Sequence, residues 1–158
     1  MKIKVGFGFD VHQLKENHPF ILGGVKLEHH SGTFGHSDAD VLAHAICDAI
    51  LGAANLEDIG YHFPNTDPQW KDINSLILLE HCVGLLKEKG WNVGNIDAML
   101  CIEAPKIKPY IQEMKKNIGK AMGLSIDDIS IKATTNETMG FIGREEGVVA
   151  YAVCLITK

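Results

Sequence analysis

The spacing of hydrophobic residues changes from segment to segment along this chain, and this change restricts its fold more than any other feature. Apolar residues alternate with lysine or glycine over residues 3–9, which is the period of a half-buried strand. Over 38–54 their spacing is helical, and Ser37 directly before this stretch suits an N-cap. A second helical stripe covers 73–89 and ends at Gly90, a common helix terminator.

The other segments follow the same two periods. Strands are predicted over 20–27, 96–102, 129–133 and 147–156, and a helix over 109–123. The order of elements, ββααβαββ, predicts an α+β fold, a single domain with one mixed β-sheet covered by helices. The long or glycine-rich connections, where sites are usually built, are residues 30–37, 55–70, 104–108 and 134–146.

Length and composition fit one compact domain. The chain has 158 residues, within the range of about 100–200 for single domains, and no repeat or linker divides it. Hydrophobic residues make up 46% and charged residues 22%, and no apolar run approaches the roughly 18 residues of a spanning helix. We therefore expect residues 1–158 to form one cytoplasmic domain without a membrane partner. A plastid form that has lost its transit peptide is the alternative.

Charge and cysteine content exclude several classes of function. With 15 Lys and Arg against 20 Asp and Glu, the net charge of −5 disfavours a nucleic-acid binder with a broad basic surface. An anionic substrate would therefore need local help from metal ions or backbone N–H groups. The four cysteines form no C-x-x-C pair, so we expect free buried thiols and neither a zinc ribbon nor a redox motif.

Asp10, His12 and His44 form a candidate metal site. Asp10 and His12 are two residues apart on or just after a strand, so both side chains leave the same face of the sheet. With His44 on the following helix they make a three-ligand set with an open fourth position, which suits Zn²⁺. Asp48, one helical turn after His44, would orient that histidine. The alternatives are a turn cap for Asp10, an ordinary helix histidine for His44 and a solvent-facing Asp48.

Two further segments carry polar groups suited to phosphate. His36 and Ser37 stand at a predicted helix N-terminus, where N–H groups and the dipole attract anions. Thr134 and Thr135 offer hydroxyls at a strand end, and Glu137 is able to hold a phosphate-bound Mg²⁺. Threonine is also an ordinary strand residue, so this segment alone is a weak signal.

The glycine-rich segment 140–147 holds an exposed-looking aromatic residue, Phe141, and a cation, Arg144. An arginine suits a diphosphate through its bidentate geometry. The competing interpretation of Arg144 is a surface salt bridge.

Taken together, the motifs resemble the 2-C-methyl-D-erythritol 2,4-cyclodiphosphate synthase family along essentially the full chain. Their joint order and spacing carry this resemblance. The matching segments are GFDVHQL, ILGGV, HSDADVLAHAICDAILGAA, DIGYHFPNTDP, AMLCIEAPKIKPYI and IKATTNETMGFIGREEGVVAYAV. Three positions depart from the family pattern, namely Asn65, Thr138 and Glu145, and they bear on loop contacts and on charge near the phosphates.

The resemblance implies two metal ions and a set of phosphate contacts. Zinc, one ion per subunit, falls on Asp10, His12 and His44. A second ion, Mg²⁺ or Mn²⁺ with the substrate diphosphate, falls on Glu137. The residues that position and stabilise the transferring phosphoryl group fall on His36, Ser37 and Thr135, with Thr134 near the phosphates.

It also implies a cytidine diphosphate substrate and a homotrimer whose sites lie between subunits. Asp58 and Gly60 would hold the ribose hydroxyls, and Ile59 and Phe63 would line the methylerythritol pocket. The segment that would cradle cytosine through backbone groups is Ala104, Pro105, Lys106, Ile107 and Lys108.

The implied reaction is the closure of 4-diphosphocytidyl-2-C-methyl-D-erythritol 2-phosphate to the cyclodiphosphate with release of CMP. A rival enzyme would use the same metal to activate water and hydrolyse the diphosphate to a linear product. A non-enzymatic rival is a trimeric sensor of cytidine nucleotides or isoprenoid diphosphates, suggested by Phe141 and Arg144. The product formed, or its absence, separates the three hypotheses.

Overall fold

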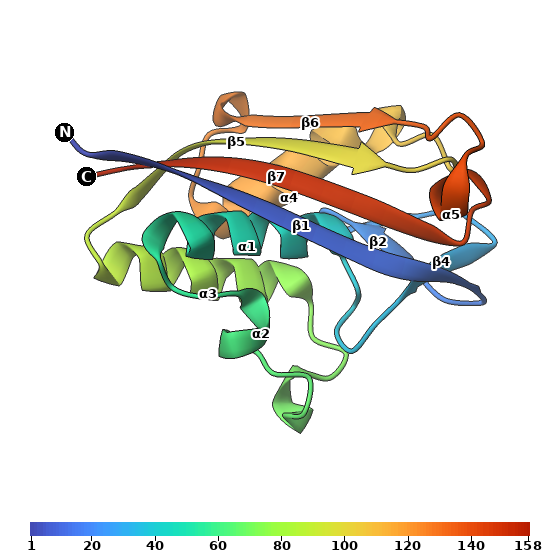
Figure 1. The fold of residues 1–158 in the computed structure, drawn as a ribbon, viewed down its shortest axis with the longest axis horizontal. Coiled ribbons are helices and arrows are strands. Elements are labelled where there is room, and N and C mark those ends of the chain that lie inside the picture. The colour runs from blue at the N-terminus through green and yellow to red at the C-terminus, as the bar shows by residue number, and fades with distance from the viewer.

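A computed structural model describes residues 1–158 and contains one five-stranded sheet with helices on one of its sides (Figure 1). The strand order is β4-β1-β7-β5-β6, and only the β5–β6 pair is parallel. The bounds are β1 Ile3–Glu16, β4 Ser31–Phe34, β5 Asn92–Cys101, β6 Ile129–Thr134 and β7 Gly147–Thr157. A separate hairpin consists of β2 Phe20–Leu22 and β3 Val25–Leu27.

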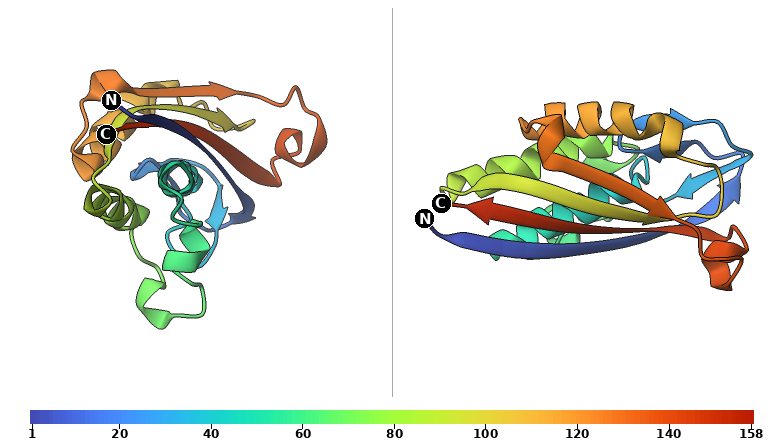
Figure 2. Two further views of the ribbon diagram at one scale, coloured as in Figure 1. Left: turned by 60° about the vertical axis from the view of Figure 1, so that its left-hand side comes forward. Right: turned by 90° about the horizontal axis from the view of Figure 1, so that it is seen from above.

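Three long helices lie on the same side of the sheet, as the two views of Figure 2 show. They are α1 Val41–Ala54, α3 Ser75–Glu88 and α4 Ile111–Met122. Short helical turns occupy the loops: α2 Ile59–His62, α5 Gly140–Gly143, η1 Pro68–Trp70, η2 Lys108–Tyr110 and η3 Ile126–Asp128. The predicted α+β class is confirmed. None of the helices has both the length and the apolar character needed to cross a membrane.

Two of the predicted assignments to the sheet are wrong. Residues 31–34, predicted as loop, form the edge strand β4 beside β1. The segment 20–27 leaves the main sheet as a hairpin, because Gly23 and Gly24 turn the chain at φ values of 56° and 70°. This turn packs on α4, where a Cβ at Gly23 would lie 2.7 Å from the Cβ of Met114.

The N-cap of α1 is Asp40 and not the predicted Ser37. The Asp40 carboxylate is fully buried and accepts hydrogen bonds from the N–H groups of Ala43, Gly23 and Gly24, at 3.1, 2.9 and 2.7 Å. One carboxylate therefore caps the helix and fastens the β2–β3 turn to it. Its two oxygens accept three N–H groups, whereas a serine hydroxyl has only two acceptor lone pairs.

Strand β1 confirms the predicted period, but its two faces are reversed relative to a simple core strand. The alternating apolar side chains within 3–9 point into solvent, whereas Gly6 and Gly8 between them face helix α1. A Cβ at Gly8 would lie 1.8 Å from the carbonyl oxygen of Ala45, and one at Gly6 would lie 1.9 Å from that of Ala49. Only glycine allows the helix to approach the strand so closely.

The far side of the sheet, opposite the helices, keeps a row of apolar side chains in solvent. We call this row the open sheet face; it consists of Ile3, Val5, Phe7, Phe9, Val11, Tyr151 and Val153. Within it the rings of Phe9 and Tyr151 lie 5.4 Å apart between centroids. A contiguous exposed apolar surface of this kind is typical of a face that is covered in an assembly.

We predict that Gly8→Ala lowers the free energy of unfolding by about 1–3 kcal/mol or more, because the added methyl group has no room against α1. The matched control is Gly52→Ala within α1, where the nearest atom to an added Cβ is 4.0 Å away. That change should be neutral or stabilise by up to about 1 kcal/mol. Urea unfolding of both variants measures the difference, and equal stability would contradict the tight contact.

Candidate metal centre and active site

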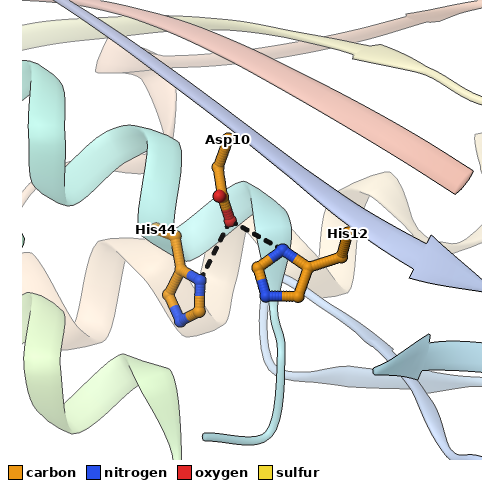
Figure 3. Close-up of side chains that lie close together, drawn as sticks. All are labelled: Asp10, His12 and His44. Carbon is orange, nitrogen blue, oxygen red and sulfur yellow. Dashed lines mark hydrogen bonds and ion pairs between the residues drawn. The ribbon is translucent and has the colours of Figure 1, made fainter. Parts of the chain in front are cut away.

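The predicted metal ligands come together between β1 and α1 (Figure 3). The Oδ2 atom of Asp10 lies 2.9 Å from Nδ1 of His12 and 3.0 Å from Nδ1 of His44. The three side chains are mostly buried, at 24%, 14% and 12% exposure for Asp10, His12 and His44. Two nitrogens and one carboxylate oxygen thus face one point, as in a catalytic zinc site with an open position.

The donor atoms fit a metal ion better than they fit one another. Nδ1 of His12 is buried and makes no hydrogen bond of acceptable geometry, although the Asp10 oxygen is only 2.9 Å away. A buried polar atom without a partner requires an explanation, and a bound cation would supply the missing interaction. Imidazole and carboxylate together suit Zn²⁺ or another first-row ion better than Mg²⁺.

The second nitrogen of His44 is held by serines and not by Asp48 as predicted. Nε2 of His44 lies 2.8 Å from Oγ of Ser75 and 3.1 Å from Oγ of Ser37. The Ser75 hydroxyl donates in turn to Asp38. Asp48 instead accepts the N–H of Ile59 at 2.8 Å, because its carboxylate is turned toward the start of α2.

Ser75 was not singled out from the sequence. The signal available there, Asn74-Ser75 before a helical stripe, indicates only a helix start, and Asn74 is indeed the N-cap of α3. The pairing of Ser75 with His44 depends on the packing of α3 beside α1, which local spacing does not reveal. Its hydroxyl fixes which nitrogen of the imidazole carries a proton and leaves Nδ1 for the centre.

Without a metal ion, the surroundings favour an ionised Asp10 and a protonated His44. Burial raises the pKa of Asp10, but the hydrogen bond from His44, the close contact with His12 and the charges of both histidines outweigh it and lower that pKa overall. Burial lowers the pKa of His44, yet the hydrogen bond and charge of Asp10 and the charges of Asp40 and Asp38 raise it overall. A metal ion that binds Nδ1 of His44 must displace the proton that the raised pKa favours on this ring. The metal affinity of the centre should therefore fall as the pH falls.

A hollow of about 150 Å³ opens beside the centre and collects many of the predicted substrate residues. Its lining consists of His12, His36, Ser37, His44, Ile59, Gly60, Phe63, Asn65, Trp70 and Leu78. Asp58 is not among them: its carboxylate caps α2 by accepting the N–H of Tyr61 at 2.9 Å. Two of the metal ligands, His12 and His44, therefore share one concave surface with His36 and Ser37 and with the region of α2.

The predicted cytidine and phosphate segments form a second hollow, of about 200 Å³. It is lined by Ile102, Glu103, Pro105, Lys106, Lys108, Ala133, Thr134 and Thr135. No residue lines both this hollow and the one beside the metal centre. Ala104 joins Pro105 by a cis peptide, and Ile107 is buried below. The two halves of the predicted site are therefore separate surfaces of the chain.

The loop after β6 is held in a tight conformation. Thr135 donates its hydroxyl to Glu137 at 3.2 Å, and Glu137 and Thr138 have φ values of 51° and 62°. The Glu103 carboxylate, which the sequence did not indicate, accepts the N–H groups of Asn136 and Thr138 at 3.0 and 3.3 Å. This leaves the exposed Glu137 carboxylate available to an ion outside the chain.

Arg144 forms the surface salt bridge that was one of its two interpretations. Its Nε and Nη2 atoms donate to the two carboxylate oxygens of Glu146, each at 2.9 Å. Phe141 is exposed at 42%, as expected for the glycine-rich segment. The four cysteines are free, and three of them are buried.

Comparison with known proteins gives one consistent result. The model of the YgbB family matches residues 3–157. A 2-C-methyl-D-erythritol 2,4-cyclodiphosphate synthase of Cytophaga hutchinsonii is 60% identical over 158 residues, which cover 100% of this chain and 99% of that protein.

Solved structures share the fold. The bifunctional IspDF from Campylobacter jejuni has a TM-score of 0.94 and 43% identity, covering 98% of this chain and 42% of that longer chain. The Plasmodium falciparum IspF–CDP complex has a TM-score of 0.86 and 34% identity, covering 98% of this chain and 95% of that one. The similarity thus extends over nearly all of the chain described above.

We predict that Ser75→Ala weakens Zn²⁺ binding about 10- to 100-fold, because His44 loses the partner that orients its ring. Ser125→Ala is the matched control, since that serine caps the distant turn η3. Titration of the metal-free proteins against a chromophoric chelator gives the dissociation constants. Equal affinities in the two variants would show that Ser75 does not support the centre.

Proposed function

The chain belongs to the YgbB family, and on this premise we propose that Asp10, His12 and His44 bind the Zn²⁺ on which its reaction depends. The chain is an enzyme, a 2-C-methyl-D-erythritol 2,4-cyclodiphosphate synthase and hence a phosphorus–oxygen lyase of the non-mevalonate route to isoprenoid precursors. The observation that carries the site proposal is the open three-donor centre beside the hollow.

The reaction is an intramolecular phosphoryl transfer. An oxygen of the 2-phosphate forms a bond to the β-phosphorus of 4-diphosphocytidyl-2-C-methyl-D-erythritol 2-phosphate, and the bond from that phosphorus to the bridging oxygen breaks. The electron pair leaves with CMP, and the ring of 2-C-methyl-D-erythritol 2,4-cyclodiphosphate closes. The attacking phosphate is already ionised near neutral pH, so the protein needs no strong base and mainly has to bring two anions into line.

The chain's own groups orient these anions in the proposal. His36 and Ser37 line the hollow at the metal centre, and Thr135 offers a hydroxyl at the end of β6. A zinc ion, when bound, supplies Lewis-acid charge to phosphate oxygens. With a net charge of −5 the protein has no broad basic surface for this purpose, so local donors must hold the substrate.

The remaining contacts follow the two hollows. Ile59 and Phe63, which line the hollow beside the metal centre, take the methylerythritol side. Asp58 and Gly60 take the ribose hydroxyls. The segment from Ala104 to Lys108, with Thr134, takes cytosine and the adjoining phosphates, which the CDP bound to the Plasmodium falciparum relative supports. Glu137 holds the diphosphate-bound Mg²⁺ or Mn²⁺, which its exposed carboxylate beside the Thr135 hydroxyl suits. Phe141 on α5 and Arg144 directly after it complete the proposed substrate contacts, although neither residue lines one of the two hollows.

We further propose that residues 1–158 are one cyclodiphosphate synthase domain that works as a homotrimer. Two observations support an assembly. The open sheet face exposes seven large apolar side chains. The hollow beside the metal centre (the metal hollow) also shares no residue with the second hollow, which holds the predicted cytidine segment (the cytidine hollow). If neighbouring copies cover the open sheet face, the metal hollow of one copy meets the cytidine hollow of the next.

The zinc proposal predicts the behaviour of His44→Ala. This variant should lose the centre's ion and at least about 100-fold in turnover, the usual loss when a group stabilising developing charge is removed. His81→Ala, an exposed histidine of α3, is the control. Metal analysis and phosphorus NMR with the diphosphocytidyl substrate report both effects. Full metal content in His44→Ala would remove His44 from the ligand set, and a linear product would point to a hydrolase.

The assembly proposal predicts complementation between inactive variants. His12→Ala damages the metal half of the site and Lys106→Glu the cytidine half, so random hybrids should regain about a quarter of wild-type sites. The two proteins are unfolded, mixed and reassembled, and hybrid formation is verified by native mass spectrometry. Hybrids without recovered turnover would mean that each site belongs to a single copy.

A further inference from the structure

A second cluster of metal-ligating side chains lies away from the catalytic centre and shares no residue with it. His29 and His30 belong to the connection between β3 and β4, and Glu145 to the turn between α5 and β7. One ligand atom from each lies within 4.8 Å of the others. The rings of His29 and His30 stand at 80° with centroids 4.1 Å apart, so neighbouring residues present both imidazoles to one place.

His29 contains a buried nitrogen that nothing in the chain satisfies. Its side chain is only 8% exposed, and Nε2 has no hydrogen-bond partner. The Oε2 atom of Glu145 lies 3.7 Å from this nitrogen, which is too long for a hydrogen bond. The ring of Phe20 lies against the ring of His29, with centroids 6.0 Å apart and planes at 26°, and Nε2 is the His29 atom beside the Glu145 carboxylate.

The backbone holds the carboxylate in place at a position that favours glycine. Glu145 has a φ of 57°, in the left-handed region, and its N–H donates to Ile142 at 2.9 Å. The backbone carbonyl oxygen of the next residue, Glu146, accepts the N–H of Leu14, and the backbone carbonyl oxygen of His30 accepts the N–H of Asn17. Backbone hydrogen bonds thus anchor both segments near the end of β1.

We propose that His29, His30 and Glu145 form a second metal site for Zn²⁺ or a similar first-row divalent ion. Two imidazoles and one carboxylate select such ions over Mg²⁺ and Ca²⁺. Ligand atoms on a tetrahedral zinc with bonds of about 2.0–2.1 Å lie roughly 3.3 Å apart, so the 3.7 Å gap closes with a small movement. The ion would clamp the β3–β4 connection to the turn before β7, independently of the reaction.

The protonation state of His29 agrees with this assignment. Burial lowers the pKa of His29, the charge of His30 lowers it further, and Glu145 opposes them only in part. The lowered pKa favours the neutral imidazole, which is the form that binds metals.

The test counts Zn²⁺ ions per chain by titrating the metal-free, full-length protein against a chromophoric chelator. Glu145→Gly removes the carboxylate and suits the left-handed backbone, so it should fold at least as well as the wild type. His29→Phe keeps an aromatic ring beside Phe20. Glu28→Gln, which removes an adjacent carboxylate outside the cluster, is the matched control.

We expect the wild type and Glu28→Gln to bind a second Zn²⁺ ion with equal affinity. Glu145→Gly and His29→Phe should bind this ion at least tenfold more weakly, because the loss of a residue that only supports a ligand already costs about 10- to 100-fold in metal affinity. His44→Ala should retain this ion, which separates it from the catalytic centre. The proposal is overturned if the wild type binds no ion beyond the one sensitive to His44→Ala. It is also overturned if an additional ion keeps its affinity in both Glu145→Gly and His29→Phe.

Discussion

The close contact between β1 and α1 is the constraint on which the rest of this structure depends. It requires glycine at Gly6 and Gly8, because carbonyl oxygens of the helix occupy the space of a Cβ. The contact brings His44 to within 3.0 Å of a carboxylate that the strand carries two residues after Gly8. It also turns the large side chains of the same strand away from the helices. The close approach of β1 to α1 therefore creates both the metal centre and the open sheet face.

The start of α1 is fixed by a charge that is costly to bury. Asp40 has no exposed surface, and burial together with the nearby charge of Asp38 raises its pKa, although three backbone N–H groups oppose the shift. Those N–H groups come from the helix and from the glycine turn of the β2–β3 hairpin. The register of the helix, and with it the position of His44, is therefore tied to a segment that contributes nothing to the chemistry.

Much of this arrangement follows from local patterns. The strand and helix periods predict most elements, and the two-residue spacing of Asp10 and His12 predicts a shared face. The failures have a common cause, since each depends on packing between segments distant in sequence. Ser75 reaches His44 across two helices, and Asp48 turns to α2 although it stands one turn from His44. The outward direction of the apolar face was equally hidden, because alternation alone does not tell which side of a strand meets the core.

In the proposed assembly, a folded single copy would be an intermediate whose open sheet face is still uncovered. When the core has formed, a single copy still presents a row of apolar side chains on β1 and β7 to water. Covering that row with another copy is a bimolecular step, so its rate rises with the number of chains present, whereas core formation does not depend on it. In a dilute solution the folded but unassembled copy would persist longer. Its exposed aromatic rings could then bind other apolar surfaces, so that aggregation would compete with assembly.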